Sequence, residues 1–199
     1  MKQKKEKLLL VVGGPGSSGS STISKMLAKH FGLPRIYAGD LFRKRARQQD
    51  IDSFEEFLQE ISHGGNSLDL EIDKLLFEYA KEGNVLIESK IFGALAKREV
   101  IDCTATIWLD SDLDTRVKRR LQKEGIKGIR AFFKKSRIRR DLKKRYVIDK
   151  EKYTRLYNIR YDAPYLYYDI VLDTSKLNEE ETFNLILREL ENGRYITKQ

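Results

Sequence analysis

A stretch rich in glycine and serine, Gly13–Thr22, constrains this chain more than any other part of its sequence. The apolar run Leu8–Val12 precedes it, and apolar residues at helical spacing follow it. A buried strand, a glycine turn and a helix together form the setting of a phosphate-binding loop. Glycines let several backbone N–H groups point at one anion, and the helix N-terminus adds partial positive charge. The stretch therefore predicts a site for the phosphates of a nucleotide.

One residue of the loop departs from the usual pattern. In G-x-x-x-x-G-K-[ST], Gly14 and Gly19 supply the glycines and Ser21 the hydroxyl that binds Mg²⁺, but Ser20 occupies the lysine position. One charge pair at about 4 Å is worth roughly 4 kcal/mol at an effective dielectric of about 20. The rest of the chain must replace that charge or do without it. The residues predicted to bind ATP are Gly14, Pro15, Gly16, Ser17, Ser18, Gly19, Ser20, Ser21 and Thr22.

Composition narrows the setting of the protein. A single cysteine, Cys103, rules out an internal disulfide and suits a reducing compartment. Leu8–Val12 is too short for the core of a signal peptide or for a membrane span. We expect a cytoplasmic protein without membrane contact, and a monomer.

Positive charge is concentrated in one segment. The chain carries a net charge of +9, yet residues 116–160 hold 19 Lys and Arg against 4 Asp and Glu, and the remainder is net acidic. Such a segment is either a solvated helical face or a surface that meets a polyanion, which is a nucleoside triphosphate or a nucleic acid.

Strand and helix patterns alternate along the chain. We predict strands at 7–12, 35–37, 84–88, 104–109 and 169–173. Helices are predicted at 20–31, 40–48, 51–82 with a break at 63–66, 91–98, 112–123, 129–145, 149–158 and 179–191. This alternation indicates a parallel sheet. Ligands of such sheets bind at the carboxyl ends of the strands, where the glycine loop, Ala38–Asp40 and Glu88–Lys90 are expected to meet.

Several stretches in order resemble the archaeal-type cytidylate kinases. Tyr37–Arg43 matches the S-A-G-[DE]-[LI]-F-R element of that family, with tyrosine in place of serine. Val85–Lys90, Ile107–Leu109 and Tyr168–Thr174 extend the similarity over nearly the whole chain. The resemblance implies a P-loop nucleoside monophosphate kinase fold, a three-layer α/β/α domain with a five-stranded parallel sheet. The single domain would comprise a core (1–38, 83–115 and 163–199), a helical acceptor-binding insert (39–82) and a basic helical lid (116–162).

The resemblance also implies an activity, the ATP-dependent phosphorylation of CMP or dCMP. Arg43 would clamp the acceptor phosphate in a pocket that includes Gly39 and Asp40, because a planar guanidinium suits a phosphate. Ser21 would bind Mg²⁺ directly and Glu88 through a water molecule. Lys90 stands where the family has arginine, so it keeps the charge and loses the bidentate geometry.

The basic lid would supply the remaining catalytic cations. Arg116 and Arg119 match the pair of arginines at the start of the family's lid, and Arg145 is the best match for a second lid arginine. Arg137, Arg139 and Arg140 are its rivals, because the alignment is ambiguous there. Our first hypothesis is that a lid arginine or Lys90 replaces the missing lysine charge.

Two other functions remain open at this stage. The chain is alternatively a catalytically impaired kinase fold that binds nucleotide or RNA through the basic lid. It is also compatible with a P-loop kinase acting on another small acceptor, such as shikimate or a coenzyme precursor, although the match at Tyr37–Arg43 argues against acceptors that are not nucleotides.

Overall fold

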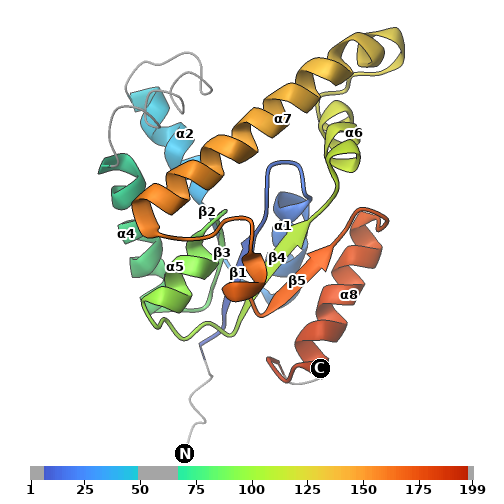
Figure 1. The fold of residues 1–199 in the computed structure, drawn as a ribbon. Helices are drawn as coiled ribbons and strands as arrows, with labels where there is room; N and C mark the ends of the chain where they lie inside the picture. The colour runs from blue at the N-terminus through green and yellow to red at the C-terminus, as the bar shows by residue number, and fades with distance from the viewer. Residues whose placement is uncertain (1–6, 49–66, 197–199) are drawn as a thin grey trace, which may run out of the picture.

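Five parallel strands form the centre of the molecule (Figure 1). The computed structural model describes residues 7–48 and 67–196. The strands are β1 (Leu9–Gly13), β2 (Arg35–Tyr37), β3 (Val85–Glu88), β4 (Ala105–Asp110) and β5 (Ile170–Asp173), in the order β2-β3-β1-β4-β5. All neighbouring pairs are parallel, which confirms the predicted sheet. The central strand β1 therefore delivers the glycine loop to the middle of the carboxyl edge.

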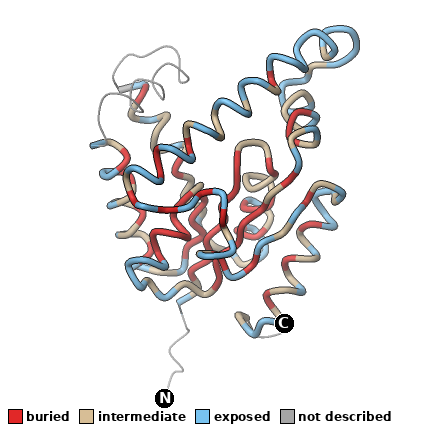
Figure 2. The backbone as a smooth tube through the Cα atoms, viewed as in Figure 1, coloured by how far each residue is buried: buried red, intermediate tan, exposed pale blue. Residues whose placement is uncertain are grey.

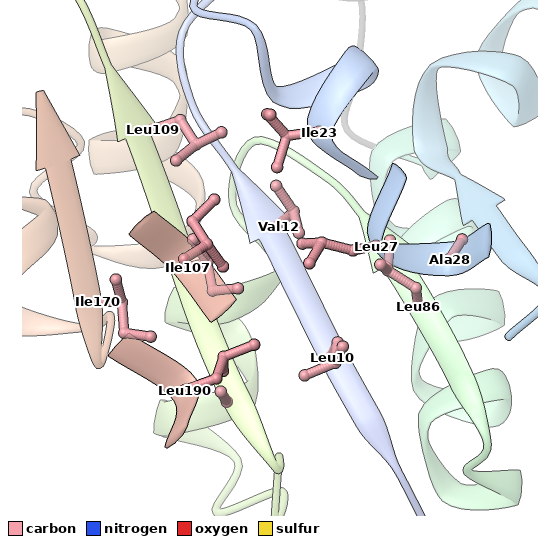
Figure 3. Packing of buried hydrophobic residues seen from close by; sticks show 12 residues of the cluster. Leu10, Val12, Ile23, Leu27, Ala28, Leu86, Ile107, Leu109, Ile170 and Leu190 are labelled. Atoms are coloured by element: carbon pink, nitrogen blue, oxygen red, sulfur yellow. The ribbon is translucent and has the colours of Figure 1, made fainter. Parts of the chain in front are cut away.

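Helices cover both faces of the sheet. Their bounds are α1 (Ser20–Phe31), α2 (Ala38–Gln48), α4 (Ser67–Glu82), α5 (Phe92–Arg98), α6 (Leu113–Lys123), α7 (Gly128–Tyr157) and α8 (Glu179–Asn192), with a short 3₁₀ turn at Pro164–Leu166. Helices α1 and α8 pack on one face, as Figure 3 shows, and α4 and α5 pack on the other. The predicted three-layer α/β/α architecture is confirmed.

Strand β1 is buried on both of its faces. Leu10 and Val12 contact the α1 and α8 side, whereas Leu9 and Val11 contact the α4 and α5 side. All four side chains are at most 2% exposed. An unbroken apolar run is typical of a strand between two helical layers, because neither face needs polar residues. The interior of the sheet is accordingly the most buried part of the trace in Figure 2.

Helix α7 is one uninterrupted helix of 30 residues. Our prediction of two helices, at 129–145 and 149–158, was wrong about the interruption. Neither glycine nor proline stands between Arg145 and Asp149, and Arg145 Nε donates to Asp149 Oδ1 over 3.2 Å across one turn. The helix ends at Asn158, whose left-handed backbone (φ 52°) closes it.

The two ends of α7 have different surroundings. Tyr153 and Tyr157 pack with Trp108 of β4 in a third apolar cluster. The first half of α7 is mostly exposed in Figure 2 and lies beside α6. Figure 1 shows α7 running from α4 to α6 along the edge where the strands end. The division into core, insert and lid remains a prediction, and residues 51–66 of the predicted insert helix lie outside the described residues.

Among the described helices, none combines the length and the apolar character that crossing a lipid bilayer requires.

Candidate active site

The glycine loop has the backbone geometry that an anion site requires. Gly14 (φ 149°) and Gly19 (φ 103°) adopt conformations that disfavour other residues. A Cβ atom on Gly14 would lie 2.3 Å from the Leu109 carbonyl oxygen, so only glycine fits there. Helix α1 begins directly after Gly19, and no acidic side chain stands in its first turn. The loop and the helix N-terminus can therefore attract a phosphate group.

An open cleft of about 1660 Å³ lies over this loop, between the carboxyl ends of the strands and α7. Its volume exceeds that of an ordinary single-ligand site, about 300–1,000 Å³, so it can hold two small ligands. All the residues predicted to bind ATP line it, together with Arg43, Glu88, Lys90, Arg119 and Arg145. Three predicted site residues, Gly39, Asp40 and Arg116, are not part of its wall.

The two residues predicted to hold Mg²⁺ lie together, and an arginine joins them. Arg35, at the start of β2, donates from Nε to the Glu88 carboxylate over 2.8 Å and from Nη2 to Ser21 Oγ over 3.1 Å. Its Nη2 also forms an ion pair with Glu88. Burial raises the pKa of Glu88, and the charge of Arg35 opposes that rise. Sequence patterns missed Arg35, because its partners are 14 and 53 residues away.

The oxygen donors present suit magnesium. A serine hydroxyl and a carboxylate are hard ligands of the kind that Mg²⁺ accepts, alongside phosphate oxygens and water. Within residues 7–48 and 67–196, no cluster of three or more acidic, histidine or cysteine side chains could hold a metal ion without such help. Ser21 and Glu88 therefore fit a Mg²⁺ ion that arrives with a nucleotide, and they do not form a complete protein cage.

Tyr37 organises the residues expected around the acceptor. The guanidinium groups of Arg35 and Arg43 lie 4.8 and 5.0 Å from the centre of its ring. Arg43 also donates to Asp40 over 2.5 Å. A Cβ atom on Gly39 would approach the Tyr37 ring to within 2.5 Å, so glycine at this position makes room for the ring. Tyrosine in place of the family's serine thus stacks against two cations beside the cleft.

A buried carboxylate holds two of the predicted catalytic cations. Asp149, with a side chain only 3% exposed, pairs with Lys90 and with Arg145. Burial lowers the pKa of Lys90 to about 8; the charge of Asp149 opposes this shift and that of Arg145 adds to it. Lys90 and Arg145 come together as the sequence suggested, but the partner that joins them was not predicted. Its pairing with Lys90 could not be recognised from the sequence, because only the fold brings these two residues near, whereas Arg145 lies one helical turn away.

The first two lid arginines hold the glycine loop in place. Arg116 donates from Nε to the Gly16 carbonyl over 2.8 Å. Arg119 donates to the carbonyls of Ser18 and Thr174, each over 2.7 Å. Of the three rivals for the second lid arginine, Arg137 and Arg139 pair with Asp141 and Asp114, and Arg140 is exposed. Arg116 and Arg119 therefore touch the loop itself, in a way that spacing alone did not indicate.

The far end of α7 is fastened to α4. Lys152 Nζ donates to Asp69 over 2.7 Å, and both side chains are nearly buried. The Tyr157 hydroxyl donates to Asp73. Burial raises the pKa of Asp73 to about 6, although the Tyr157 hydrogen bond lowers it. These contacts connect the lid helix to a helix of the predicted acceptor insert.

The loop, the parallel sheet and the cleft define a phosphotransferase of the P-loop kinase class. Residues 12–131 match the AAA domain family. The cytidylate kinase of Pyrococcus horikoshii is 35% identical over 92% of this chain and 88% of its own length. Those of Methanopyrus kandleri and Methanocaldococcus jannaschii are 32% and 31% identical, over 90% and 93% of the chain and 91% and 98% of their own lengths. The chain belongs to the cytidylate kinase family.

Solved structures share the fold at low sequence identity. The shikimate kinase of Bacteroides thetaiotaomicron superposes with a TM-score of 0.63 at 14% identity, covering 95% of this chain and 99% of its own. A putative kinase of Chloroflexus aurantiacus gives 0.55 at 13% identity, over 96% and 100%. At such identities the likeness concerns the fold alone.

Proposed function

We propose that this protein transfers the γ-phosphoryl group of ATP, with Mg²⁺, to a nucleoside monophosphate, and that CMP and dCMP are its preferred acceptors. The observation that carries the proposal is a single cleft in which the glycine loop faces Arg43, Lys90 and basic residues of α7. The names of the relatives support the choice of acceptor. The volume of the cleft, about 1660 Å³, suits a donor and an acceptor bound together.

In the proposed site, separate groups of residues bind the donor phosphates, the acceptor phosphate and the metal ion. Loop amides and the N-terminus of α1 cradle the donor phosphates, while Arg43 and Lys90 draw the acceptor phosphate toward them. A Mg²⁺ ion that arrives with ATP would supply neutralising charge for the phosphoryl group. Ser21 and Glu88 hold its position, directly and through water. No side-chain nucleophile is required, because the acceptor phosphate itself attacks in line.

A coupled assay of ADP formation tests this function. We expect CMP or dCMP to stimulate ADP release well above the rate of ATP hydrolysis alone, with UMP and AMP less effective. A thermal-shift series with the same monophosphates provides an independent ranking, since a bound ligand raises apparent stability. Absence of turnover with every nucleoside monophosphate would contradict the proposal, and turnover with shikimate instead would identify a different acceptor.

The surface of the first turns of α7 makes RNA binding a second candidate function. Ile129, Phe132 and Phe133 are 75%, 76% and 72% exposed, and the two phenyl rings lie 5.6 Å apart. The exposed cations around them are Lys127, Arg130, Lys134 and Lys135. Aromatic rings among lysines and arginines suit single-stranded RNA, whose bases stack and whose phosphates attract the cations.

Fluorescence anisotropy with a labelled single-stranded oligouridine measures this second function. Binding should weaken steeply with salt. The double variant Phe132→Ala, Phe133→Ala should weaken it at least fivefold while leaving CMP phosphorylation unchanged. The pair Lys143→Ala, Lys144→Ala, which removes charge but no aromatic ring, separates electrostatic attraction from stacking. Undetectable or salt-insensitive binding would remove this reading of the surface.

A further inference from the structure

The cations that the sequence offered as replacements for the missing loop lysine are already engaged. Lys90 and Arg145 share the buried carboxylate of Asp149. Arg116 and Arg119 donate to backbone carbonyls of the loop, which fixes them outside or at the edge of the phosphate cradle. Lys90 and Arg145 thus share one partner, and backbone carbonyls hold Arg116 and Arg119. Arg35 is also paired, with Glu88, but in addition it donates to the hydroxyl of Ser21, next to Ser20.

Arg35 donates to the residue that directly follows the position where that charge is missing. Its Nη2 is 3.1 Å from Ser21 Oγ, and Ser21 is the next residue after Ser20 in the first turn of α1. The side chain of Arg35 is 16% exposed, so water screens its charge only in part. Arg35 is not part of the wall of the cleft, whereas Ser21 and Glu88 are, so Arg35 can act on a bound nucleotide through these two residues.

Charges at this corner of the cleft explain why a cation is required. Glu88 is 4% exposed and lies next to Ser21. Without a cation beside it, the carboxylate of Glu88 would add a negative charge next to the triphosphate. Arg35 neutralises this carboxylate, whereas the lysine of the ordinary motif reaches the β- and γ-phosphates themselves.

We propose that Arg35 supplies, from β2, the positive charge that Ser20 does not supply from the loop. It acts on the phosphates through Ser21 and Glu88, so it is a positioning residue. Tyr37 supports it from the other side, with its ring 4.8 Å from the guanidinium carbon. The inference rests on the proposed nucleotide-binding function, and it concerns the donor half of the site only.

A double-mutant cycle tests the substitution of one charge for the other. The four proteins are wild type, Arg35→Gln, Ser20→Lys and the double variant, each measured for binding of a fluorescent ATP analogue and for CMP-dependent ADP formation. Arg35→Gln should weaken ATP binding at least tenfold. On its own, Ser20→Lys should change the affinity for ATP less than threefold. In the double variant it should restore the affinity for ATP to within threefold of the wild-type value. Such non-additivity marks two groups that serve one purpose.

The outcomes separate this inference from the proposed function. If Ser20→Lys has the same effect in both backgrounds, or if Arg35→Gln binds ATP as the wild type does, the inference is overturned. ATP binding needs no acceptor, so a protein that shows the cycle in binding but phosphorylates no monophosphate refutes only the proposed function.

Two further variants guard against loss of structure. Arg35→Lys keeps a cation next to Glu88 and should bind ATP within threefold of the wild type. If Arg35→Gln alone does not fold, the double variant is compared with Ser20→Lys, and equal ATP affinity is expected. A double variant that folds and binds ATP tenfold more weakly than Ser20→Lys would overturn the inference.

Discussion

Lys90 ties the binding of an acceptor phosphate to pH. Its pKa of about 8 results from burial, which outweighs the attraction of Asp149. The cationic form that attracts a phosphate therefore declines as pH rises through 8. We expect kcat/KM for CMP to fall about 25-fold between pH 7.5 and 9.5 in the wild type, in proportion to the protonated fraction of Lys90. Lys90→Arg should show a flat profile, because a guanidinium stays protonated.

Initial rates at several pH values and limiting CMP measure this effect. The KM for ATP serves as the internal control, since Lys90 lies on the acceptor side of the proposed site. Parallel decline in the wild type and in Lys90→Arg would assign the pH dependence to another group.

At the level of single residues, sequence reasoning succeeded where the backbone sets the role. Gly14 and Gly19 could be recognised because a phosphate loop needs their conformations, and both have positive φ. Arg35 and the pairing of Asp149 with Lys90 could not be found, because these contacts join residues that only the folded chain brings near. Gly39 was expected in the acceptor pocket, yet its visible role is to admit the ring of Tyr37.

Where α4 contacts α7, the carboxyl group of Asp73 makes the stability of the protein depend on pH. The pKa of Asp73 is raised to about 6, above the ordinary value of about 3.9, so the native state favours the protonated form. The stability that this proton contributes is complete below pH 4 and is lost as pH rises through 6. Between pH 4 and 7, the free energy of unfolding of the wild type should fall by about 2 kcal/mol relative to that of Asp73→Asn.

Urea unfolding at pH 4, 5, 6 and 7 tests the role of Asp73. The matched control is Asp141→Asn, an exposed carboxylate of α7 that should change in parallel with the wild type. If the unfolding free energy of Asp73→Asn changes with pH in parallel with that of the wild type, the pH dependence comes from another group.

The bounds of most elements follow from local signals, but the continuity of α7 does not. Gly32 ends α1 and Gly83 follows the end of α4, both with positive φ, as glycine after a helix predicts. Between Arg145 and Asp149 the apolar spacing changes without any residue that breaks a helix. The change reflects a new environment, since α7 passes there from solvent to the tyrosine cluster around Trp108.

For the whole molecule, alternating strand and helix patterns were sufficient to predict a parallel sheet and three layers. They could not give the strand order, because β2-β3-β1-β4-β5 depends on which crossovers pass over which strands. Nor could they show that α7 is joined to α4, since that connection depends on the side chains of Lys152 and Tyr157.

Helix α7 is continuous and contacts both α4 and α6. We therefore expect the binding of the acceptor and the binding of the donor to be coupled. Arg140→Gly with Asp141→Gly places a flexible point in an exposed part of α7, at a cost of about 1 kcal/mol for each glycine. The apparent KM for ATP, which should decrease with saturating CMP in the wild type, should become independent of CMP in this variant. Arg140→Ala with Asp141→Ala keeps the helix and should keep the coupling. Equal coupling in both pairs would show that continuity is irrelevant.

Helix α7 also sets the scale of any motion. From Lys152, which Asp69 holds, to Gly128 the helix spans about 36 Å, so a tilt of about 10° at Lys152 would displace Gly128 by about 6 Å. Helix α7 thus has the layout of a lever, with a short arm on α4 and a long arm that reaches over the cleft. A small tilt at the buried ion pair of Lys152 and Asp69 would therefore become a displacement of several ångströms at the other end of α7.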